Sequence, residues 1–325
     1  MNIEEITNSK GQLIDDAMND VFKGNIPNLY DAIKYHIDTG GKRIRPILAI
    51  LTYEALGKEP KKIAPFAAAC EVLHNWILVH DDIEDGDRMR RDKPTVWVKY
   101  GIAHGINVGD LMAHKVFELI LKSDFDEKTI LKLTEATMTA AIKTAEGQAM
   151  DINLRDNNSP TENDYMRMIT GKTAHYLTLP MVGAAVAAGS RQDMINKMIE
   201  FGKFIGPAFQ ITDDVLDLTE GKGRGEIGRD IKEGKRSILV VHCLSKCTKD
   251  EKKKIIEILN KSPEKTSSAD VAFAKKLFEK YKSIEYARSR AESFAAQAKK
   301  IADTMPRNLK EILYFFADYL VKRRK

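Results

Sequence analysis

Apolar residues recur along most of the chain at the spacing of one face of an α-helix. Such a face repeats every three to four residues, whereas a half-buried strand alternates every two. Two sets with helical spacing are Ile47, Leu48, Leu51, Ala55 and Leu56, and Leu131, Ala136, Met138 and Ile142. Each set predicts a helix with a buried face. Because alternating strand-like runs are absent, the fold class is predicted to be all-α.

Glycine and proline gather where these helices are expected to end. The breaks fall at 40–41, 57–60, 157–160, 221–228 and 262–268. Thr161 is followed by Glu162 and Asp164, which is typical of a helix N-terminus because acidic groups there interact well with the helix dipole. No shift in composition marks a domain boundary, so a single helical domain over 1–325 is expected.

Composition narrows the class of protein. The 325 residues are 43% hydrophobic and carry a net charge of +5, with no basic stripe of the kind that binds nucleic acid. The three cysteines form no CxxC pair, and the first ten residues lack the apolar core of a secretory signal. Leu177 to Gly189 is the longest weakly polar stretch and is too short to span a membrane. These features predict a soluble, cytoplasmic protein without membrane insertion.

Two acidic motifs of the form Asp-Asp-x-x-Asp stand out. The first motif comprises Asp81, Asp82 and Asp85, and the second comprises Asp213, Asp214 and Asp217. Both follow apolar residues at helical spacing, so the first and fifth residues of each lie one turn apart on one face. Carboxylates at that spacing repel each other, and a cation between them reverses the sign of the interaction.

The acidic motifs predict magnesium sites. Mg²⁺ binds through one or two carboxylates together with substrate phosphates. Two acidic helix faces that point toward each other across a bundle would hold several Mg²⁺ ions around a diphosphate. Two solvated acidic patches are the alternative. Neither segment has the alternating acidic loop of an EF-hand.

Basic clusters surround the acidic motifs in the sequence. Lys42 and Arg45 follow Gly40-Gly41 and are expected on one face of the next helix. Arg88, Arg90 and Arg91 come shortly after the first motif, and further small basic clusters occur at 171–173 and 234–237. Arginine can bind phosphate oxygens through two parallel hydrogen bonds, so these clusters fit a diphosphate substrate.

With these motifs the chain resembles the trans-isoprenyl diphosphate synthases, also called polyprenyl synthetases. The resemblance covers most of the chain and rests on the paired acidic motifs and on His74, with the segments GGKRIRP (40–46), LVHDDIED (78–85), RMRRDKPT (88–95), GD (109–110), EGQAMD (146–151), GKTA (171–174), FQITDDVLDL (209–218) and IGRDIKEGKRS (227–237). It implies an isoprenoid-synthase-type bundle of antiparallel helices around a deep central cavity, usually in a homodimer.

The resemblance also implies a role for each matching residue. Three Mg²⁺ ions and the allylic diphosphate would be bound by Asp81, Asp82, Asp85, Asp213, Asp214 and Asp217. Arg90, Lys172 and Lys235 would contact that diphosphate, and Lys42, Arg45, His74 and Arg91 would hold isopentenyl diphosphate. Thr173 and Gln210 would line the place where positive charge develops. The implied reaction is ionisation of the allylic diphosphate, attack by the isopentenyl double bond and loss of a proton.

Two positions depart from the family pattern. Asp92 follows the double arginine where the family commonly has glycine, and the lysine expected before Gly225 is missing. Arg224 or Lys222 could substitute for that lysine. The basic tail, Arg323 to Lys325, could help to close the site or could be a solvated terminus.

Product length depends, in the family, on bulky residues before the first motif. Trp76 lies five positions before Asp81, with Ile77 and Leu73 nearby. The resemblance implies that Trp76 blocks long products and that the product is geranylgeranyl or farnesyl diphosphate, with a leaning to the former; Trp76 as an ordinary core aromatic is the alternative. The compact first motif resembles the archaeal type.

Two other functions are considered. A terpene cyclase usually replaces the second acidic motif by an Asn/Ser/Glu-type motif, and a non-catalytic subunit of a heteromeric synthase typically loses acidic residues. This chain keeps both motifs complete. The preferred allylic primer, among dimethylallyl, geranyl and farnesyl diphosphate, is left open by the sequence.

Overall fold

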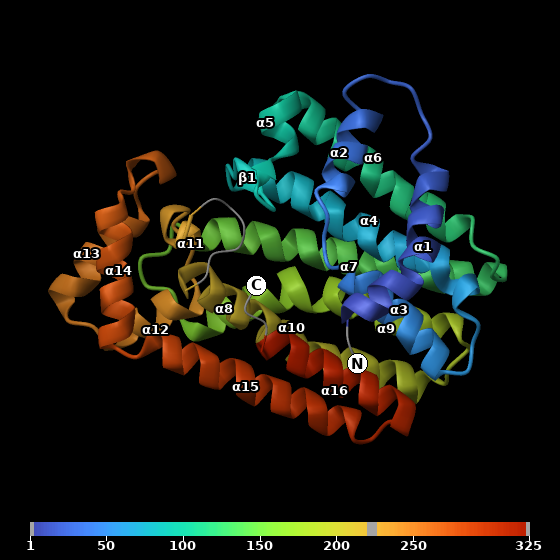
Figure 1. Cartoon of the computed structure of the whole chain (residues 1–325). Coiled ribbons are helices and arrows are strands. Elements are labelled where there is room, and N and C mark those ends of the chain that lie inside the picture. Colours follow the sequence, from blue (N-terminus) through green and yellow to red (C-terminus); the bar gives the residue numbers. More distant parts are fainter. Residues whose placement is uncertain (1–2, 220–225, 323–325) are drawn as a thin grey trace. The chain divides into compact units, whose positions relative to one another are not determined.

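The computed structural model describes residues 3–219 and 226–322 and is almost entirely helical in that part (Figure 1). The all-α prediction is therefore confirmed. Contacts between Cα atoms divide the chain into two compact units. The first unit comprises Met1–Ala141, Tyr176–Ile199 and Thr304–Phe315, and the second comprises Ile142–His175, Glu200–Asp303 and Phe316–Lys325.

The first unit is built around one long helix, α4. Helix α4 packs against α6, α3 and α1, and its buried residues include Phe66, Val72 and Leu73. The helices of this unit are α1 (Ile3–Val21), α2 (Tyr30–Asp38), α3 (Ile44–Ala55), α4 (Pro60–Glu84), α5 (Val96–Tyr100), α6 (Ile102–Leu121), the first part of α7 (Glu127–Leu154), most of α9 (His175–Ala187), and the first parts of α10 (Gln192–Thr219) and α16 (Arg307–Lys322).

The second unit has its own apolar core. In it α12 packs against α15 and α8, and α14 packs against α15. Besides the last parts of α7, α10 and α16, the elements of this unit are α8 (Glu162–Ile169), the π-helical turn η1 (Thr170–Ala174), α11 (Arg229–Lys232), α12 (Ile238–Lys246), α13 (Lys249–Leu259), the 3₁₀ turn η2 (Pro263–Lys265), α14 (Ser268–Lys280) and α15 (Ser283–Ala302). The predicted start of α8 is confirmed, because Thr161 and Asp164 form a reciprocal capping box.

Helix α4 also satisfies the length and hydropathy of a membrane span, and among the described residues it is the one helix that does. It is 25 residues long, and 67% of its most apolar window is buried inside the structure. Core helices of soluble proteins pass the same test. We therefore interpret α4 as a core helix of the first unit.

The buried face predicted for α7 is wrong. Leu131, Met138 and Ile142 are 58%, 48% and 52% exposed, whereas Thr137 and Ala140 are buried. Thr137 can lie inside because its hydroxyl donates a hydrogen bond to the Leu133 carbonyl within the helix (2.7 Å). Apolar periodicity identified the helix, but it assigned the buried side to the wrong face.

A small antiparallel hairpin follows the first acidic motif and was not predicted. Strands β1 (Met89–Arg90) and β2 (Lys93–Pro94) pair across a two-residue turn, and both turn residues have positive φ, 52° at Arg91 and 59° at Asp92. Tight hairpins favour this left-handed geometry, which glycine, asparagine and aspartate tolerate best. Asp92 is therefore a residue that fits the turn.

This geometry predicts how substitutions at Asp92 affect stability. We expect Asp92→Asn to be nearly neutral and Asp92→Gly to be neutral or slightly stabilising. Asp92→Val should lower the free energy of unfolding by about 1–2 kcal/mol, because a β-branched residue is strained in the left-handed region. Urea denaturation of the three variants measures the order, and equal stability of the valine and glycine variants would contradict the turn assignment.

Candidate functional site

The first acidic motif forms the C-terminal end of α4, and its carboxylates are buried. Asp81, Asp82 and Asp85 are 8%, 1% and 4% exposed. The Asp85 amide donates to the Asp81 carbonyl (2.8 Å), so the two residues lie one turn apart as expected. Sequence reasoning missed a fourth buried carboxylate, Asp87, which is 1% exposed. Its backbone is held by hydrogen bonds from Thr95 and from the Trp97 indole to its carbonyl.

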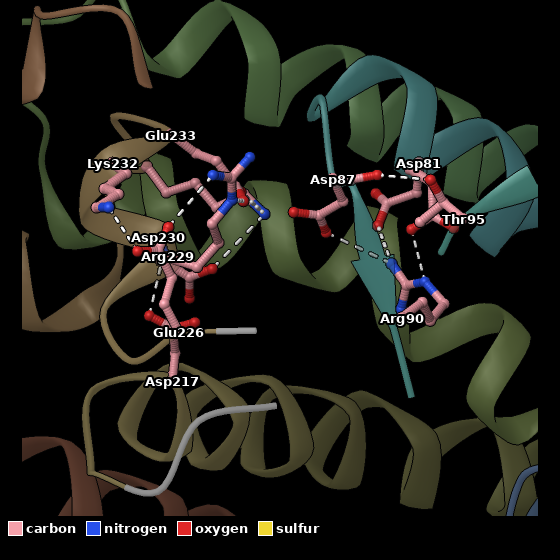
Figure 2. Close-up of polar contacts among 12 residues, drawn as sticks. Asp81, Asp87, Arg90, Thr95, Asp217, Glu226, Arg229, Asp230, Lys232 and Glu233 are labelled. Carbon is pink, nitrogen blue, oxygen red and sulfur yellow. Dashed lines mark hydrogen bonds and ion pairs between the residues drawn. The ribbon is translucent and has the colours of Figure 1, made fainter. Parts of the chain in front are cut away.

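Arg90 from strand β1 supplies the counter-charge for this group. Its Nε donates to Asp82 Oδ1 (2.6 Å), and its Nη2 lies 3.6 Å from Asp81 Oδ2 and 3.7 Å from Asp87 Oδ2. Figure 2 shows Arg90 pointing toward Asp81 and Asp87. Burial raises the pKa of the Asp82 carboxyl to about 7, although the charge of Arg90 acts in the opposite direction.

A basic cluster in the first unit brings together three of the predicted isopentenyl-site residues. Arg45 Nη2 donates to the Tyr176 hydroxyl (3.2 Å) and lies over its ring, while the His74 ring stacks on Tyr176 at 6.1 Å. Arg91 donates hydrogen bonds to Thr39 Oγ1 and to the Gly40 carbonyl. Burial holds the pKa of His74 well below its usual range, and the charges of Arg45 and Arg91 act in the same direction. His74 is therefore neutral.

Lys42 does not share a helix face with Arg45, as the sequence had suggested. Helix α3 begins at Ile44, so Lys42 lies in the loop that precedes the helix. Its side chain is exposed. Arg43 takes a left-handed conformation (φ 49°) and is turned to Glu71, with 3.3 Å between Nη1 and Oε1. The left-handed residue at the start of α3 breaks the helical periodicity on which that expectation relied.

His36 and Glu71, which the sequence analysis missed, are buried in the same unit. Glu71 accepts hydrogen bonds from Arg43 and from the Asn75 side chain. Burial lowers the pKa of His36 to about 3, with smaller contributions from Arg91 and Arg90. The helical spacing of Glu71 before His74 was a usable signal for one of them, whereas nothing local marked His36.

In the second unit, four polar side chains form a chain of hydrogen bonds at the second acidic motif. Thr173 Oγ1 donates to Gln210 Oε1 (3.0 Å), and Gln210 Nε2 donates to Asp214 Oδ1 (3.0 Å). The Tyr165 hydroxyl, which was also missed, donates to Asp214 Oδ2 (2.7 Å). Both oxygens of Asp214 are thereby oriented, and the structure brings Thr173 and Gln210 together.

Asp217 has a different environment from Asp213. It is 2% exposed, and its Oδ2 accepts a hydrogen bond from the Asp230 amide (3.0 Å). Asp213 is half-buried on the same helix, α10. The carboxylate of Asp217 thus stabilises the start of α11 in addition to any role as a ligand.

Lys172 and Lys235, the two predicted lysines, both act on one carboxylate. Lys172 Nζ lies 2.7 Å from Asp151 Oδ2. Burial disfavours the charged form of Asp151, but Lys172 and Lys235 outweigh this effect and keep the pKa of its carboxyl below the usual value. Lys235 also pairs with Glu233 (2.7 Å) and lies 3.7 Å from Asp230. Figure 2 shows the surrounding ion pairs of Arg229 and Lys232 with Glu233 and Glu226.

A π-helical turn positions Lys172 and Thr173. Single π turns inside helices often occur at functional sites. Here the turn η1 packs closely on Gly147 of the EGQAMD segment, where a Cβ would lie 2.0 Å from the Lys172 nitrogen. Gly206 of α10 is similarly close to Ala174. The two glycines permit this approach, so they belong to the framework of the site.

Some candidate residues lie outside the described part of the chain. Lys222 and Arg224, the possible substitutes for the missing lysine, lie outside the described residues, and so does the basic tail at 323–325. Trp76, Ile77 and Leu73 all lie on α4 before the first motif, as predicted. Leu73 is buried, whereas Trp76 and Ile77 are partly buried against the core.

A surface hollow of about 690 Å³ in the second unit contains none of the predicted residues. Lys280 in its wall is already paired with Glu251 (2.6 Å). Its lining residues are His242, Lys246, Lys280, Tyr281, Lys282, Glu285, Tyr286 and Ser289.

The chain belongs to the polyprenyl synthetase family, whose model matches residues 26–276. It is 36% identical to a geranylgeranyl diphosphate synthase of Sulfolobus acidocaldarius, over 99% of this chain and 97% of that protein. It is 37% identical to a short chain isoprenyl diphosphate synthase of Methanocaldococcus jannaschii, over 91% and 89%. The structure of a geranylgeranyl pyrophosphate synthetase from Pyrococcus horikoshii superposes with a TM-score of 0.89 at 31% identity, covering 99% and 98%.

These relatives confirm the family and the enzyme class that the motifs had indicated. The chain is a prenyltransferase with the all-α fold of polyprenyl synthases. The assignments of individual site residues stay predictions.

The low pKa of His36 predicts acid sensitivity. Since the folded protein holds His36 neutral down to about pH 3, and an unfolded histidine titrates near pH 6.5, the unfolded state binds more protons between these values. Stability should therefore be complete above about pH 6.5 and fall as the pH is lowered toward 3. One such group contributes a slope of up to about 1.4 kcal/mol per pH unit.

Urea denaturation at several pH values tests this expectation. His36→Gln should flatten the loss of stability between pH 6.5 and 3, whereas His114→Gln, at an exposed position, should not. An unchanged slope in the His36 variant would contradict a neutral buried imidazole.

Proposed function

We propose that this enzyme condenses isopentenyl diphosphate with an allylic diphosphate to give a short all-trans product. The allylic partner is dimethylallyl, geranyl or farnesyl diphosphate, and the product is geranylgeranyl diphosphate or, as a second choice, farnesyl diphosphate. The observation that carries the proposal is the buried group of Asp81, Asp82, Asp85 and Asp87 beside Arg90. Such a group suits a metal and a diphosphate rather than an apolar core.

Carboxylate oxygens are the kind of ligand that Mg²⁺ prefers. Oδ2 of Asp82 is buried and, within the described part of the chain, has no hydrogen-bond partner, so it can accept a cation at little cost. We assign Asp81, Asp82, Asp85, Asp213, Asp214 and Asp217 as ligands for up to three ions. Bound Mg²⁺ stabilises negative charge on the departing diphosphate.

The cationic side chains divide into two groups. Arg90, Lys172 and Lys235 are assigned to the allylic diphosphate. Each is positively charged and is held in place by a buried carboxylate, so each can donate a charge-assisted hydrogen bond to a phosphate oxygen. Lys42, Arg45, His74 and Arg91 are assigned to isopentenyl diphosphate. Neutral His74 can donate a hydrogen bond to a phosphate oxygen while Arg45 supplies the charge.

Thr173 and Gln210 are assigned to the site of positive charge. Their hydrogen bonds to each other and to Asp214 orient the hydroxyl and amide dipoles before the reaction, which is the condition for electrostatic stabilisation. The allylic cation is attacked by the isopentenyl double bond, and the proton then lost goes to the released diphosphate. Water has to be excluded because it would react with the cation.

The location, domain organisation and oligomer belong to the same proposal. All three cysteines are free thiols, as expected in a reducing cytoplasm. The family match extends through both units, in agreement with one polyprenyl synthetase domain over 1–325. Exposed apolar side chains on the consecutive helices α6 and α7 support a homodimer, because monomers rarely expose large apolar patches. They are Ile102, Ile106, Leu121, Leu131 and Met138.

A product assay tests the reaction. The purified protein, Mg²⁺, labelled isopentenyl diphosphate and each allylic diphosphate in a separate tube should give a C20 or C15 product by chromatography, and EDTA should abolish it. Asp82→Asn should lower the rate at least about a hundredfold, whereas the exposed Asp92→Asn should not. No condensation with any primer would favour a non-catalytic subunit, and a cyclic hydrocarbon would favour a terpene cyclase.

Trp76 is assigned as the residue that limits product length. Trp76→Ala removes a large aromatic side chain from α4, so products should become longer by at least one five-carbon unit. Trp97→Phe, at the other tryptophan, should leave the length unchanged. Chromatography of the dephosphorylated products measures both, and an unchanged length in Trp76→Ala would remove Trp76 from this role.

Lysine substitutions test the homodimer. Ile106→Lys and Met138→Lys place charges on the exposed surface of α6 and α7 and should shift the mass measured by light scattering from dimer to monomer. Ile26→Lys is the matched control, because Ile26 is 57% exposed and lies in the loop before α2. A wild-type monomer, or a dimer that survives both substitutions, would contradict the proposed surface.

A further inference from the structure

Trp76 is held by a side chain one turn further along the same helix. Its indole Nε1 donates a hydrogen bond to His80 Nδ1 at 3.3 Å, and the two rings meet edge to face with centroids 6.4 Å apart. Residues four apart on a helix lie on one face, so α4 itself brings the two rings together. The hydrogen bond adds a directional contact to the packing of the indole.

The other side of the His80 ring is fixed by α6. A neutral imidazole that accepts at Nδ1 carries its proton on Nε2. That nitrogen lies 3.4 Å from the Ile106 carbonyl oxygen and 3.6 Å from Asp110 Oδ1. At Gly109 a Cβ would lie 2.1 Å from His80 Nε2, so only glycine leaves room for the ring. The imidazole is therefore held between the backbone of α6 and the indole.

We propose that His80 is a positioning residue for product length. It holds the indole of Trp76 in one orientation, so that the ring stays across the path of the growing chain. The proposal rests on the proposed function and on the role of Trp76 in it. An indole without this hydrogen bond is free to turn aside, and some chains then pass it and undergo a further condensation.

A pair of amide substitutions separates the two nitrogens of His80. The oxygen of asparagine is as many bonds from Cβ as Nδ1 is, so His80→Asn keeps an acceptor for the indole. The longer side chain of His80→Gln instead reaches the position of Nε2. In His80→Gln the ratio of the next longer product to the main product should rise about fivefold, as expected for loss of one hydrogen bond. In His80→Asn it should stay within twofold of wild type.

Trp76→Phe provides the test from the other partner. It keeps an aromatic ring but has no N–H, so it should raise the ratio about as much as His80→Gln does. Because both changes remove the same hydrogen bond, the double variant should show no additional rise. Gly109→Ala should raise the ratio too, since the added methyl group displaces the His80 ring.

Fluorescence gives a readout that does not depend on turnover. The chain has two tryptophans, so Trp97→Phe leaves Trp76 as the single indole. In that background His80→Gln should lower the anisotropy of the indole and raise its quenching by acrylamide, while His80→Asn should do neither. Circular dichroism verifies that each variant is folded.

The outcomes distinguish the role of His80 from the proposed condensation reaction on which it rests. A wild-type protein without condensation would overturn the proposed function. Longer products with Trp76→Ala but unchanged ratios with His80→Gln and Trp76→Phe would overturn the role of His80 alone. A rise in His80→Gln and Trp76→Phe that is absent in His80→Asn, with the matching change in anisotropy, is the expected result.

Discussion

The burial of several carboxylates is the constraint on which the rest of the structure depends. Removing an ionised carboxylate from water is costly unless a charge or hydrogen-bond donors compensate, and here both acidic motifs lie on helices with apolar neighbours. In the first unit the compensation comes from Arg90 of strand β1. In the second unit it comes from Tyr165, Gln210 and the Asp230 amide. In each unit these groups compensate the buried carboxylates of one acidic motif.

Irregular backbone conformations position several side chains of the candidate site. The left-handed residues Arg43 and Arg91 direct one arginine to Glu71 and the other to the Gly40 carbonyl. The π turn at 170–174 presents Lys172 and Thr173, and Gly147 allows its close approach to α7. Strained backbone of this kind persists only where surrounding contacts stabilise it. The regular helices supply those contacts.

Trp76 packs in the first unit and is the residue that we propose to limit product length. It packs against the core of the first unit, and its indole N–H donates a hydrogen bond to His80. A buried or half-buried indole usually finds such a partner. His80 immediately precedes Asp81, so the residue that contacts the indole is adjacent in the chain to a residue that we propose as a metal ligand. The residues proposed for product length and those proposed for metal binding thus follow one another along α4.

The sequence by itself determined the helical class, the family and the identity of the acidic motifs, because helical periodicity and the spacing of Asp81 to Asp85 are local properties. The tertiary structure decided the face of α7 that is buried and the position of Lys42 before α3. It also revealed His36, Asp151 and Tyr165, whose significance arises from partners distant in the sequence. Burial, and with it a shifted pKa or an oriented carboxylate, depends on neighbours that only folding brings together.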